Sequence, residues 1–165
     1  MKETATHIYF WGTYLSNWHK CVFKDDQFLY PSSEAYLMTQ KALLFGDIES
    51  ATKIIKTREP RKQKALGRLV KGFNDTVWNQ HKFEIMVKGL FLKFSQNKSL
   101  KNQLLATGSK TLVEGSPYDK IWGVGLKWDD PRILDEANWK GENRLGQALM
   151  IIREMMIFED SKHRL

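Results

Sequence analysis

Apolar residues recur at three- and four-residue intervals along several stretches of the chain, the spacing that places them on one face of an α-helix. The longest stretch follows Asn74, a residue type that favours the position just before a helix, and its predicted buried stripe runs from Phe83 to Phe94. Gly46 and Pro60 suit the end of one helix and the first turn of another. Helices are therefore predicted from Pro31-Ser32-Ser33 to Phe45, after Asp47, from Pro60 to near Gly72, after Asn74, from Leu100 to Ala106 and after Asn143.

Shorter apolar segments outside these helices predict a few strands: His7–Trp11, Lys20–Phe23, Gln27–Tyr30 and Thr111–Glu114. The second and third segments flank Asp25-Asp26, which suggests a hairpin. Strands and helices do not alternate regularly, and no glycine-rich phosphate loop is present, which disfavours a doubly wound nucleotide fold. The pattern predicts a mainly helical α+β fold with a few short strands. We expect a single domain over residues 1–165, with its core at about 8–158.

Composition narrows the function classes. Hydrophobic residues make up 42% of the 165 residues, which indicates a folded domain, and no apolar run reaches the roughly 18 residues of a membrane span. The polar start, Met1–Thr6, has no signal-peptide run, so we expect a cytoplasmic protein without a membrane partner. Cys21 is the one cysteine and the four histidines are scattered, so neither a disulfide nor a metal site is expected.

The formal net charge is +7, which favours anionic partners. Much of the excess lies in one stretch in which only Glu59 opposes seven cations. Two interpretations stay open at this point: a surface for a phosphate-rich ligand such as nucleic acid, or an ordinary solvated helix face. The cations are Lys56, Arg58, Arg61, Lys62, Lys64, Arg68 and Lys71.

Glu34 is the carboxylate of greatest interest. It falls in the first turn of a predicted helix, where an acid is commonly only a partner of the helix dipole. Its neighbours Tyr30, Tyr36 and Leu37 are aromatic or apolar, and such surroundings can prepare a carboxylate for acid–base or charge-stabilising work. Lys41 lies two turns further on and roughly on the same face.

Other candidates also carry two interpretations. Trp78, in the first turn of the longest helix, fits a core position or a surface that stacks on a base. Asn143 fits a plain N-cap or, at a helix start, a phosphate seat. The segment Trp122-Gly123-Val124-Gly125 fits an ordinary turn or a close approach of backbone to a ligand. The acids Glu114, Asp119, Asp129 and Asp130, which lie in the predicted strand and the region after it, match no metal-binding motif.

Taken together, these motifs resemble the NADAR (YbiA-like) family over roughly Ile8 to Met156. The matching blocks occur in the family's order. They are 15–17 (Leu-Ser-Asn), 30–36 (Tyr-Pro-Ser-Ser-Glu-Ala-Tyr) with Gln40-Lys41, Gly67-Arg68, Trp78, 104–108, 112–117, 119–126, and 143–146 with Leu149-Met150. Two positions depart from the family pattern. Ala35 stands where a histidine is common, and Val124 stands where some members carry an aspartate, so the roles of those two residues are not transferred.

The resemblance implies an enzyme that hydrolyses N-glycosidic bonds without a metal or organic cofactor. Two substrate classes are associated with the family: ADP-ribose attached to guanine, including guanine in DNA, and phosphoribosylamino intermediates of riboflavin synthesis. We expect the first class because of the basic stretch. A non-catalytic module that binds ADP-ribose or nucleic acid is the third hypothesis, and intact Glu34 and Asp119 argue against it.

By the same resemblance, Glu34, Asp119 and Trp78 match the family's active-site positions. Further positions match motifs that are expected to bind the substrate, which carries ADP-ribose or a phosphoribosyl group. They are Asn17, Tyr36, Lys41, Arg68, Glu114, Trp122, Gly123 and Asn143.

Overall fold

In a computed structural model, which describes residues 1–163, the mainly helical α+β class predicted from the sequence is confirmed. The contacts of the chain fall into two compact units. The central unit is Asn17–Asn97, and the terminal unit combines Met1–Ser16 with Lys98–Leu165.

The central unit begins with a β-hairpin. Strands β3 (Lys20–Lys24) and β4 (Leu29–Ser32) pair antiparallel, as the sequence predicts, although β4 continues through Pro31 to Ser32. Asp25 fixes the turn because its Oδ1 accepts hydrogen bonds from the backbone N–H groups of Gln27 and Phe28, at 2.8 and 2.7 Å. Its Oδ2 accepts the hydroxyl of Tyr30 at 2.7 Å.

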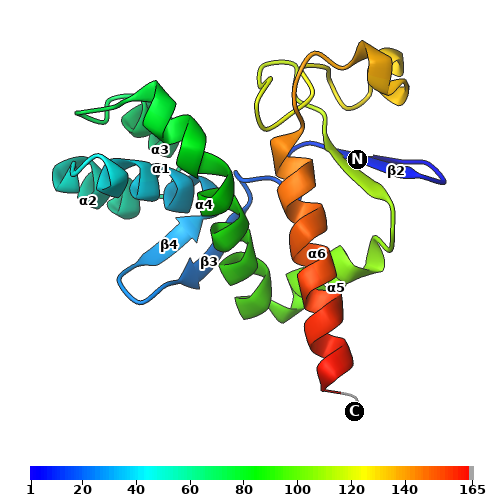
Figure 1. Cartoon of the computed structure of the whole chain (residues 1–165), viewed down its shortest axis with the longest axis horizontal. Coiled ribbons are helices and arrows are strands. Elements are labelled where there is room, and N and C mark those ends of the chain that lie inside the picture. Colours follow the sequence, from blue (N-terminus) through cyan, green and yellow to red (C-terminus); the bar gives the residue numbers. More distant parts are fainter. Residues whose placement is uncertain (164–165) are drawn as a thin grey trace. The chain divides into compact units, whose positions relative to one another are not determined.

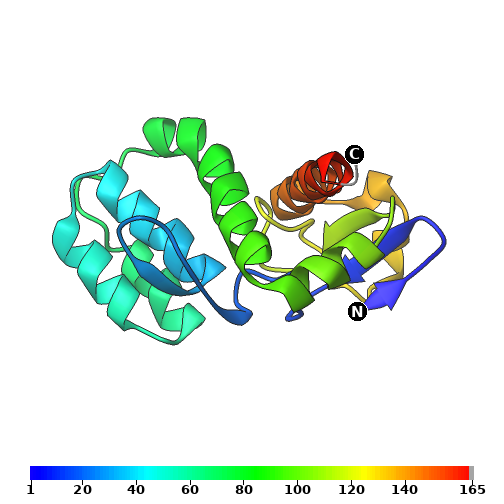
Figure 2. The same cartoon turned by 90° about the horizontal axis from the view of Figure 1, so that it is seen from below.

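Four helices follow the hairpin: α1 (Ser33–Leu44), α2 (Ile48–Lys56), α3 (Pro60–Gly67) and α4 (Asp75–Gln96). Helices α2, α3 and α4 each pack against α1, so α1 is the centre of this unit (Figure 1). Strand β4 also contacts α1, and the view in Figure 2 shows the hairpin beside it. Ser32, Asp47 and Asn74 precede α1, α2 and α4, and each accepts a backbone N–H with its side chain, which confirms the cap predicted at Asn74.

Two glycines let the helices of the central unit approach α1 closely. A Cβ on Gly67 of α3 would overlap the side chain of Met38, and a Cβ on Gly89 of α4 would overlap the ring of Tyr36. The core beside Tyr36 is aromatic and includes Phe23 and Tyr30. These contacts fix the position of α1, which carries Glu34.

The terminal unit holds a three-stranded sheet in the order β1 (Lys2–Glu3), β2 (His7–Phe10), β5 (Thr111–Glu114). Strand β2 pairs antiparallel with β1 and parallel with β5. Helix α5 (Lys98–Ala106) precedes β5, and helix α6 (Arg144–Lys162) packs against β5 (Figure 2). Two short 3-10 helices, Pro131–Leu134 and Glu136–Asn138, lie in the segment between β5 and α6.

Some sequence predictions were wrong. Helix α3 ends at Gly67 and not near Gly72, because the chain turns so that Val70 is buried and the Lys71 N–H reaches Asp47 Oδ2. Strand β1 was not predicted, since two residues show no periodicity.

The buried faces of the two longest helices also differ from the predicted stripes. Lys93 of α4 is fully buried, and burial lowers its pKa to about 8. On α6, Met155 is 41% exposed and Arg153 is buried. The helical spacing instead predicts a core face made of Leu145, Ala148, Leu149, Ile152, Met155 and Met156. Arg153 is accommodated because its guanidinium donates to Thr107 Oγ1 and to the Lys110 carbonyl, both at 2.8 Å. None of the helices in the described part of the chain combines the length and apolarity that crossing a membrane requires.

Candidate active site

The start of α1 is held by a chain of hydrogen bonds that reaches α3. Ser32 Oγ accepts the backbone N–H of Ala35 at 3.0 Å and donates to Gln63 Oε1 at 2.6 Å. The amide nitrogen of Gln63 donates in turn to the Thr57 carbonyl at 2.6 Å, and the Gln63 side chain is fully buried. The first turn of α1 therefore has a defined position relative to α3.

Glu34 lies in this first turn and is only 6% exposed. Its backbone N–H donates to the Asn17 carbonyl at 3.0 Å, which brings Asn17 next to the helix start. Asn17 is also buried, and within residues 1–163 its side-chain oxygen accepts no hydrogen bond. A buried acceptor of this kind suits a donor group on a ligand.

Lys41 lies near Glu34, as the two-turn spacing predicts. Burial lowers the pKa of the Lys41 ammonium, Glu34 and Asp75 oppose that shift, and Arg68 adds to it. The ammonium nitrogen lies 4.4 Å from the ring centre of Phe73 and 5.8 Å from that of Trp78. A cation over two aromatic rings is attracted by the negative charge on their faces.

Four predicted site residues therefore come together in the central unit. Glu34 and Lys41 come from α1, Arg68 caps the C-terminus of α3 and Trp78 lies in the first turn of α4. Trp78 is mostly buried at 9% exposure, whereas Arg68 is exposed. The group combines a carboxylate, an aromatic ring and two cations, which are the parts required to hold a base, a sugar and a phosphate.

Tyr36 lies on a different side of α1. Its ring packs against Phe23 and Tyr30, with ring centres 5.9 and 5.0 Å apart, and against Gly89. Burial, with a smaller contribution from the charge of Asp25, raises the pKa of its phenol to about 12. In this structure Tyr36 is a packing residue of the central unit, apart from the group around Glu34.

Three residues of this neighbourhood were not predicted from the sequence. Gln63 belongs to no recognised motif, and nothing in the basic stretch around it indicates that its side chain is buried. Phe73 and Asp75 flank the N-cap Asn74, and their position just before Trp78 was the available signal.

The remaining predicted site residues lie in the terminal unit. Asp119 Oδ1 accepts the backbone N–H groups of Ile121 and Trp122, at 2.9 and 2.8 Å, and the Asp119 carbonyl accepts the N–H of Gly125 at 3.2 Å. Asp119 thus shapes the turn that presents Trp122, a partly buried side chain. Glu114, at the end of β5, is buried, and its carbonyl accepts the Val124 N–H at 3.0 Å.

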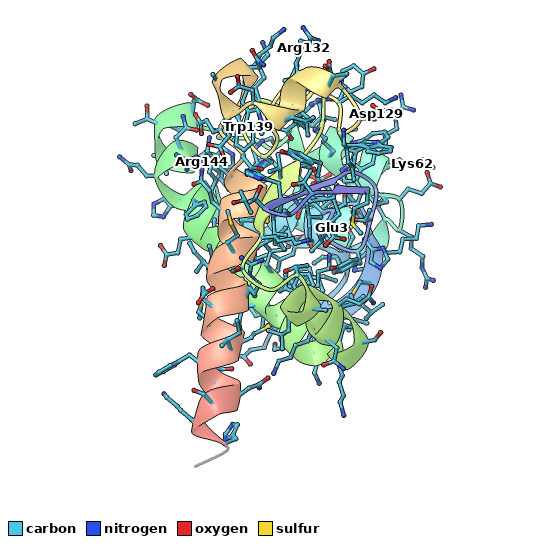
Figure 3. All side chains as sticks on the ribbon, turned by 90° about the vertical axis from the view of Figure 1, so that its right-hand side faces the viewer. Glu3, Lys62, Asp129, Arg132, Trp139 and Arg144 are labelled. Carbon is cyan, nitrogen blue, oxygen red and sulfur yellow. The ribbon has the colours of Figure 1, made fainter. Side chains whose placement is uncertain are left out.

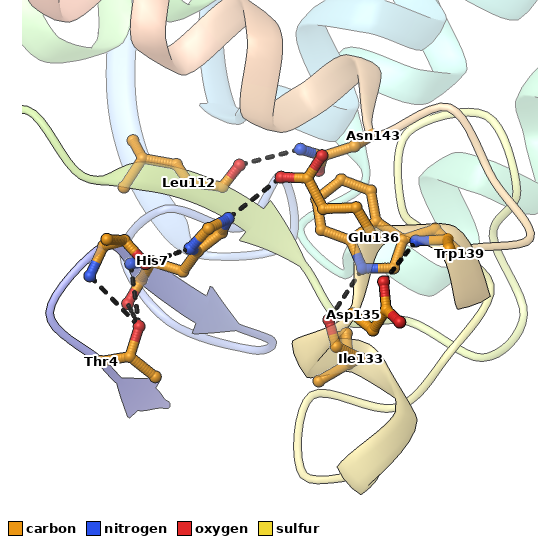
Figure 4. A network of polar contacts seen from close by, with 10 residues as sticks. Thr4, His7, Leu112, Ile133, Asp135, Glu136, Trp139 and Asn143 are labelled. Atoms are coloured by element: carbon orange, nitrogen blue, oxygen red, sulfur yellow. Dashed lines mark hydrogen bonds and ion pairs between the residues drawn. The ribbon is translucent and has the colours of Figure 1, made fainter.

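Asn143 precedes α6 but does not cap it with its side chain. Its Oδ1 accepts the Glu114 N–H at 3.0 Å and its Nδ2 donates to the Leu112 carbonyl at 2.9 Å, as Figure 4 shows for Leu112. Its backbone adopts a left-handed conformation with φ of 52°. The side chain therefore fastens the start of α6 to β5, which explains an asparagine here without any ligand.

Gly123 has a similar internal explanation. A Cβ at this position would lie 2.9 Å from the Asp119 carbonyl oxygen and 3.0 Å from that of Glu114.

Hydrogen bonds also hold the segment before α6: His7 bonds to Glu136, and the indole of Trp139 donates to the Ile133 carbonyl at 2.8 Å (Figure 4). The side chains of Trp139 and Arg144 flank the segment that leads into α6 (Figure 3). The segment between β5 and α6 is thus held in place by hydrogen bonds within the terminal unit.

Within the described residues, no three or more histidine, cysteine, aspartate or glutamate side chains gather where they could hold a metal ion.

Comparison with known proteins gives the family. An N-glycosidase of Acanthamoeba polyphaga mimivirus is 44% identical over 165 residues, covering 92% of this chain and 97% of that protein. A riboflavin biosynthesis protein of Vibrio vulnificus is 31% identical over 141 residues, covering 86% of this chain but 35% of that protein. The NMR structure of the E. coli protein YbiA matches with a TM-score of 0.80 and 31% identity, covering 98% of this chain and 91% of that one. Residues 9–157 match the NADAR domain, and the chain therefore belongs to the NADAR domain family.

Proposed function

We propose that this protein is an N-glycosidase that removes ADP-ribose from guanine. The observation that carries the proposal is the group in the central unit: buried Glu34, with Lys41 held over Trp78 and under the influence of Arg68. The name N-glycosidase, given to the mimivirus relative and to YbiA of E. coli, supports the reaction class.

The chemistry required is a substitution at the anomeric carbon. The C–N bond breaks and its electron pair leaves with the base nitrogen, which takes up a proton. Positive charge develops on the sugar as an oxocarbenium-like state, and water adds its hydroxide to that carbon while its second proton is released. A carboxylate near the sugar stabilises the charge and can accept that proton from water, and we assign this role to Glu34.

The other residues are given binding roles. The Trp78 ring is suited to stacking on guanine, because every base has a flat π-face. Lys41 and Arg68 provide positive charge for the diphosphate of ADP-ribose. The buried side-chain oxygen of Asn17 suits a ribose hydroxyl or a base N–H. The family resemblance also assigns Asp119 to catalysis and Glu114, Trp122, Gly123 and Asn143 to substrate binding, and we keep these assignments as proposals for the terminal unit. Tyr36 is proposed to support the position of α1.

An alternative substrate class is the phosphoribosylamino intermediates of riboflavin synthesis. The observation that favours it is the name of the Vibrio vulnificus relative. The same carboxylate chemistry applies, and a phosphoribosyl group carries one phosphate in place of the diphosphate. The basic stretch around Arg68 favours the larger, more anionic ADP-ribosyl substrate.

A direct experiment distinguishes the two substrate classes. The protein is incubated with ADP-ribosyl-guanosine and, separately, with the riboflavin intermediates, and the released products are identified by mass spectrometry. The proposal expects free ADP-ribose and guanosine. Release only from the riboflavin intermediates supports the alternative, and release from neither contradicts both.

A further inference from the structure

A pocket in the central unit lies between the β3–β4 hairpin and the end of α2. Its volume is ≈ 490 Å³, within the size range of small-molecule sites. None of Glu34, Lys41, Arg68 and Trp78 lines it, so it is distinct from the group to which we assign the hydrolysis.

The charged residues of this pocket all have one sign. Lys20 comes from β3, Lys56 ends α2 and Arg58 follows it, and no acidic residue is among the lining residues. None of the ion pairs within residues 1–163 involves these three side chains. By contrast, the ammonium of Lys62 lies 3.5 Å from the Glu59 carboxylate and that of Lys71 lies 3.7 Å from the Glu49 carboxylate. Three neighbouring cations without a counter-ion suit an anionic group.

The walls of the pocket are aliphatic. Val22 and Leu29 are 56% and 59% exposed, and they line the pocket with Ile55. An apolar ligand that covers exposed aliphatic side chains in a concave surface gains binding free energy, because apolar area is removed from water. Tyr30, the aromatic residue of the lining, is fully buried, so no ring face is offered for stacking a base.

We propose that this pocket binds a small organic anion with an aliphatic body. Its acid group contacts Lys20, Lys56 and Arg58, and its body covers Val22, Leu29 and Ile55. A phosphate ester and a carboxylate share this chemistry. The site is independent of the reaction assigned to Glu34.

The test uses four probes in isothermal titration calorimetry with the whole protein. Octyl phosphate and octanoate carry both an anionic head and an aliphatic body, whereas inorganic phosphate and octanol each carry one of the two. We expect octyl phosphate, octanoate or both to bind at least about tenfold more tightly than inorganic phosphate or octanol, because the charged and the apolar contact contribute together. The stronger amphiphile identifies the acid group. The proposal is overturned if neither octyl phosphate nor octanoate binds, or if both bind no more tightly than inorganic phosphate and octanol.

Variants locate the binding. Lys56→Gln with Arg58→Gln removes two cations of the pocket, and we expect affinity to fall about tenfold or more. Lys62→Gln with Lys71→Gln changes the net charge equally outside the pocket and is expected to leave affinity unchanged. Cys21 lines the pocket and is the one cysteine of the chain, so a bound amphiphile should also slow its alkylation. Equal loss in both double variants, or no loss in either, contradicts the proposed site.

Discussion

The ammonium of Lys41 lies 5.8 Å from the ring centre of Trp78, although the two residues are 37 positions apart and come from different helices. The contact joins the helix that carries Glu34 to the first turn of α4. It places a cation beside the face on which we propose that the base stacks. The predictions below test whether this arrangement performs the proposed hydrolysis.

The first prediction concerns Glu34. Glu34→Gln keeps the shape of the side chain but removes its charge, and we expect turnover of ADP-ribosyl-guanosine to fall about a hundredfold or more with the fold retained. Circular dichroism melting checks the fold, and single-turnover product release measures the rate. Glu84→Gln, an exposed position on α4, is the matched control. Turnover close to wild type in folded Glu34→Gln would remove the catalytic assignment.

Much of the central unit could be predicted from sequence because its signals are local. Ser32, Asp47 and Asn74 are caps whose side chains act within three residues, and the Glu34–Lys41 pair follows from helical spacing alone. The separation of Tyr36 from Glu34 could also have been inferred, since residues two apart on a helix point in different directions.

Other features depend on partners distant in sequence. Gln63 contacts Ser32 across 31 positions, and Asn143 contacts Leu112 across 31. The burial of Lys93 contradicts the usual placement of lysine, and only tertiary packing determines it. Local sequence patterns do not show such contacts, which is why the sequence leaves Asn143 as either a plain N-cap or a phosphate seat and does not predict its bond to Leu112.

The second prediction separates stacking from packing at Trp78. If the ring stacks on the base, Trp78→Phe retains partial turnover, whereas Trp78→Ala loses about 1 to 3 kcal/mol of transition-state stabilisation, roughly 5- to 150-fold. A purely structural tryptophan predicts a loss of folding stability of about 3 to 5 kcal/mol in the alanine variant, with normal turnover per folded molecule. Melting temperature and turnover measured on the same samples distinguish the two roles.

The third prediction concerns the hydrogen bonds that position Glu34. Ser32→Ala removes the cap of α1 and leaves Gln63 Oε1 without its donor, so we expect a loss of about 0.5 to 2 kcal/mol in stability. Because Glu34 lies in the same turn, kcat should fall more than KM changes, and Ser32→Thr should restore it.

The control for this positioning role is another cap. Asp47→Ala removes the cap of α2 and should lower stability without a comparable loss of kcat. If the two variants lower kcat equally, or if Ser32→Ala leaves kcat unchanged, the Ser32–Gln63 contact serves stability alone.

The fourth prediction is a pH dependence at Asp47. Hydrogen bonds from the Ser50 hydroxyl and from the backbone N–H groups of Lys71 and Ser50 hold the pKa of this carboxyl at about 2. The ionised Asp47 carboxylate therefore stabilises the folded state. Its contribution to the free energy of unfolding is complete above the unfolded-state pKa, about 4, and is lost as the pH falls through the folded-state pKa, about 2. Asp47→Asn lacks this charge. Its urea midpoint should therefore lie below that of wild type at pH 5, and the difference should narrow between pH 4 and pH 2. A constant difference over that range would contradict the assignment.

The last prediction concerns presentation of the adduct on single-stranded DNA. Arg61, Lys64 and Arg68 occupy i, i+3 and i+7 positions and so share one face of α3 and its C-cap, and none of the ion pairs in the described chain involves them. Lys62 points to another side and lies 3.5 Å from Glu59, while Lys71 lies 3.7 Å from Glu49. The face that contains Arg68 is therefore the part of the basic stretch that we expect to contact the phosphates of DNA.

In a plot of log affinity for DNA against log salt concentration, Arg61→Gln with Lys64→Gln should reduce the magnitude of the slope by about 1.4. Each single-strand phosphate contact contributes about 0.7 to that slope. The same variant should raise KM for a modified oligonucleotide and leave hydrolysis of free ADP-ribosyl-guanosine unchanged. Lys62→Gln with Lys71→Gln has the same net charge and should behave like wild type in all three measurements. If both double variants flatten the slope equally, net charge and not a defined surface attracts the DNA. If neither does, this face is solvated surface, and free nucleotides or riboflavin intermediates become the better-supported substrates.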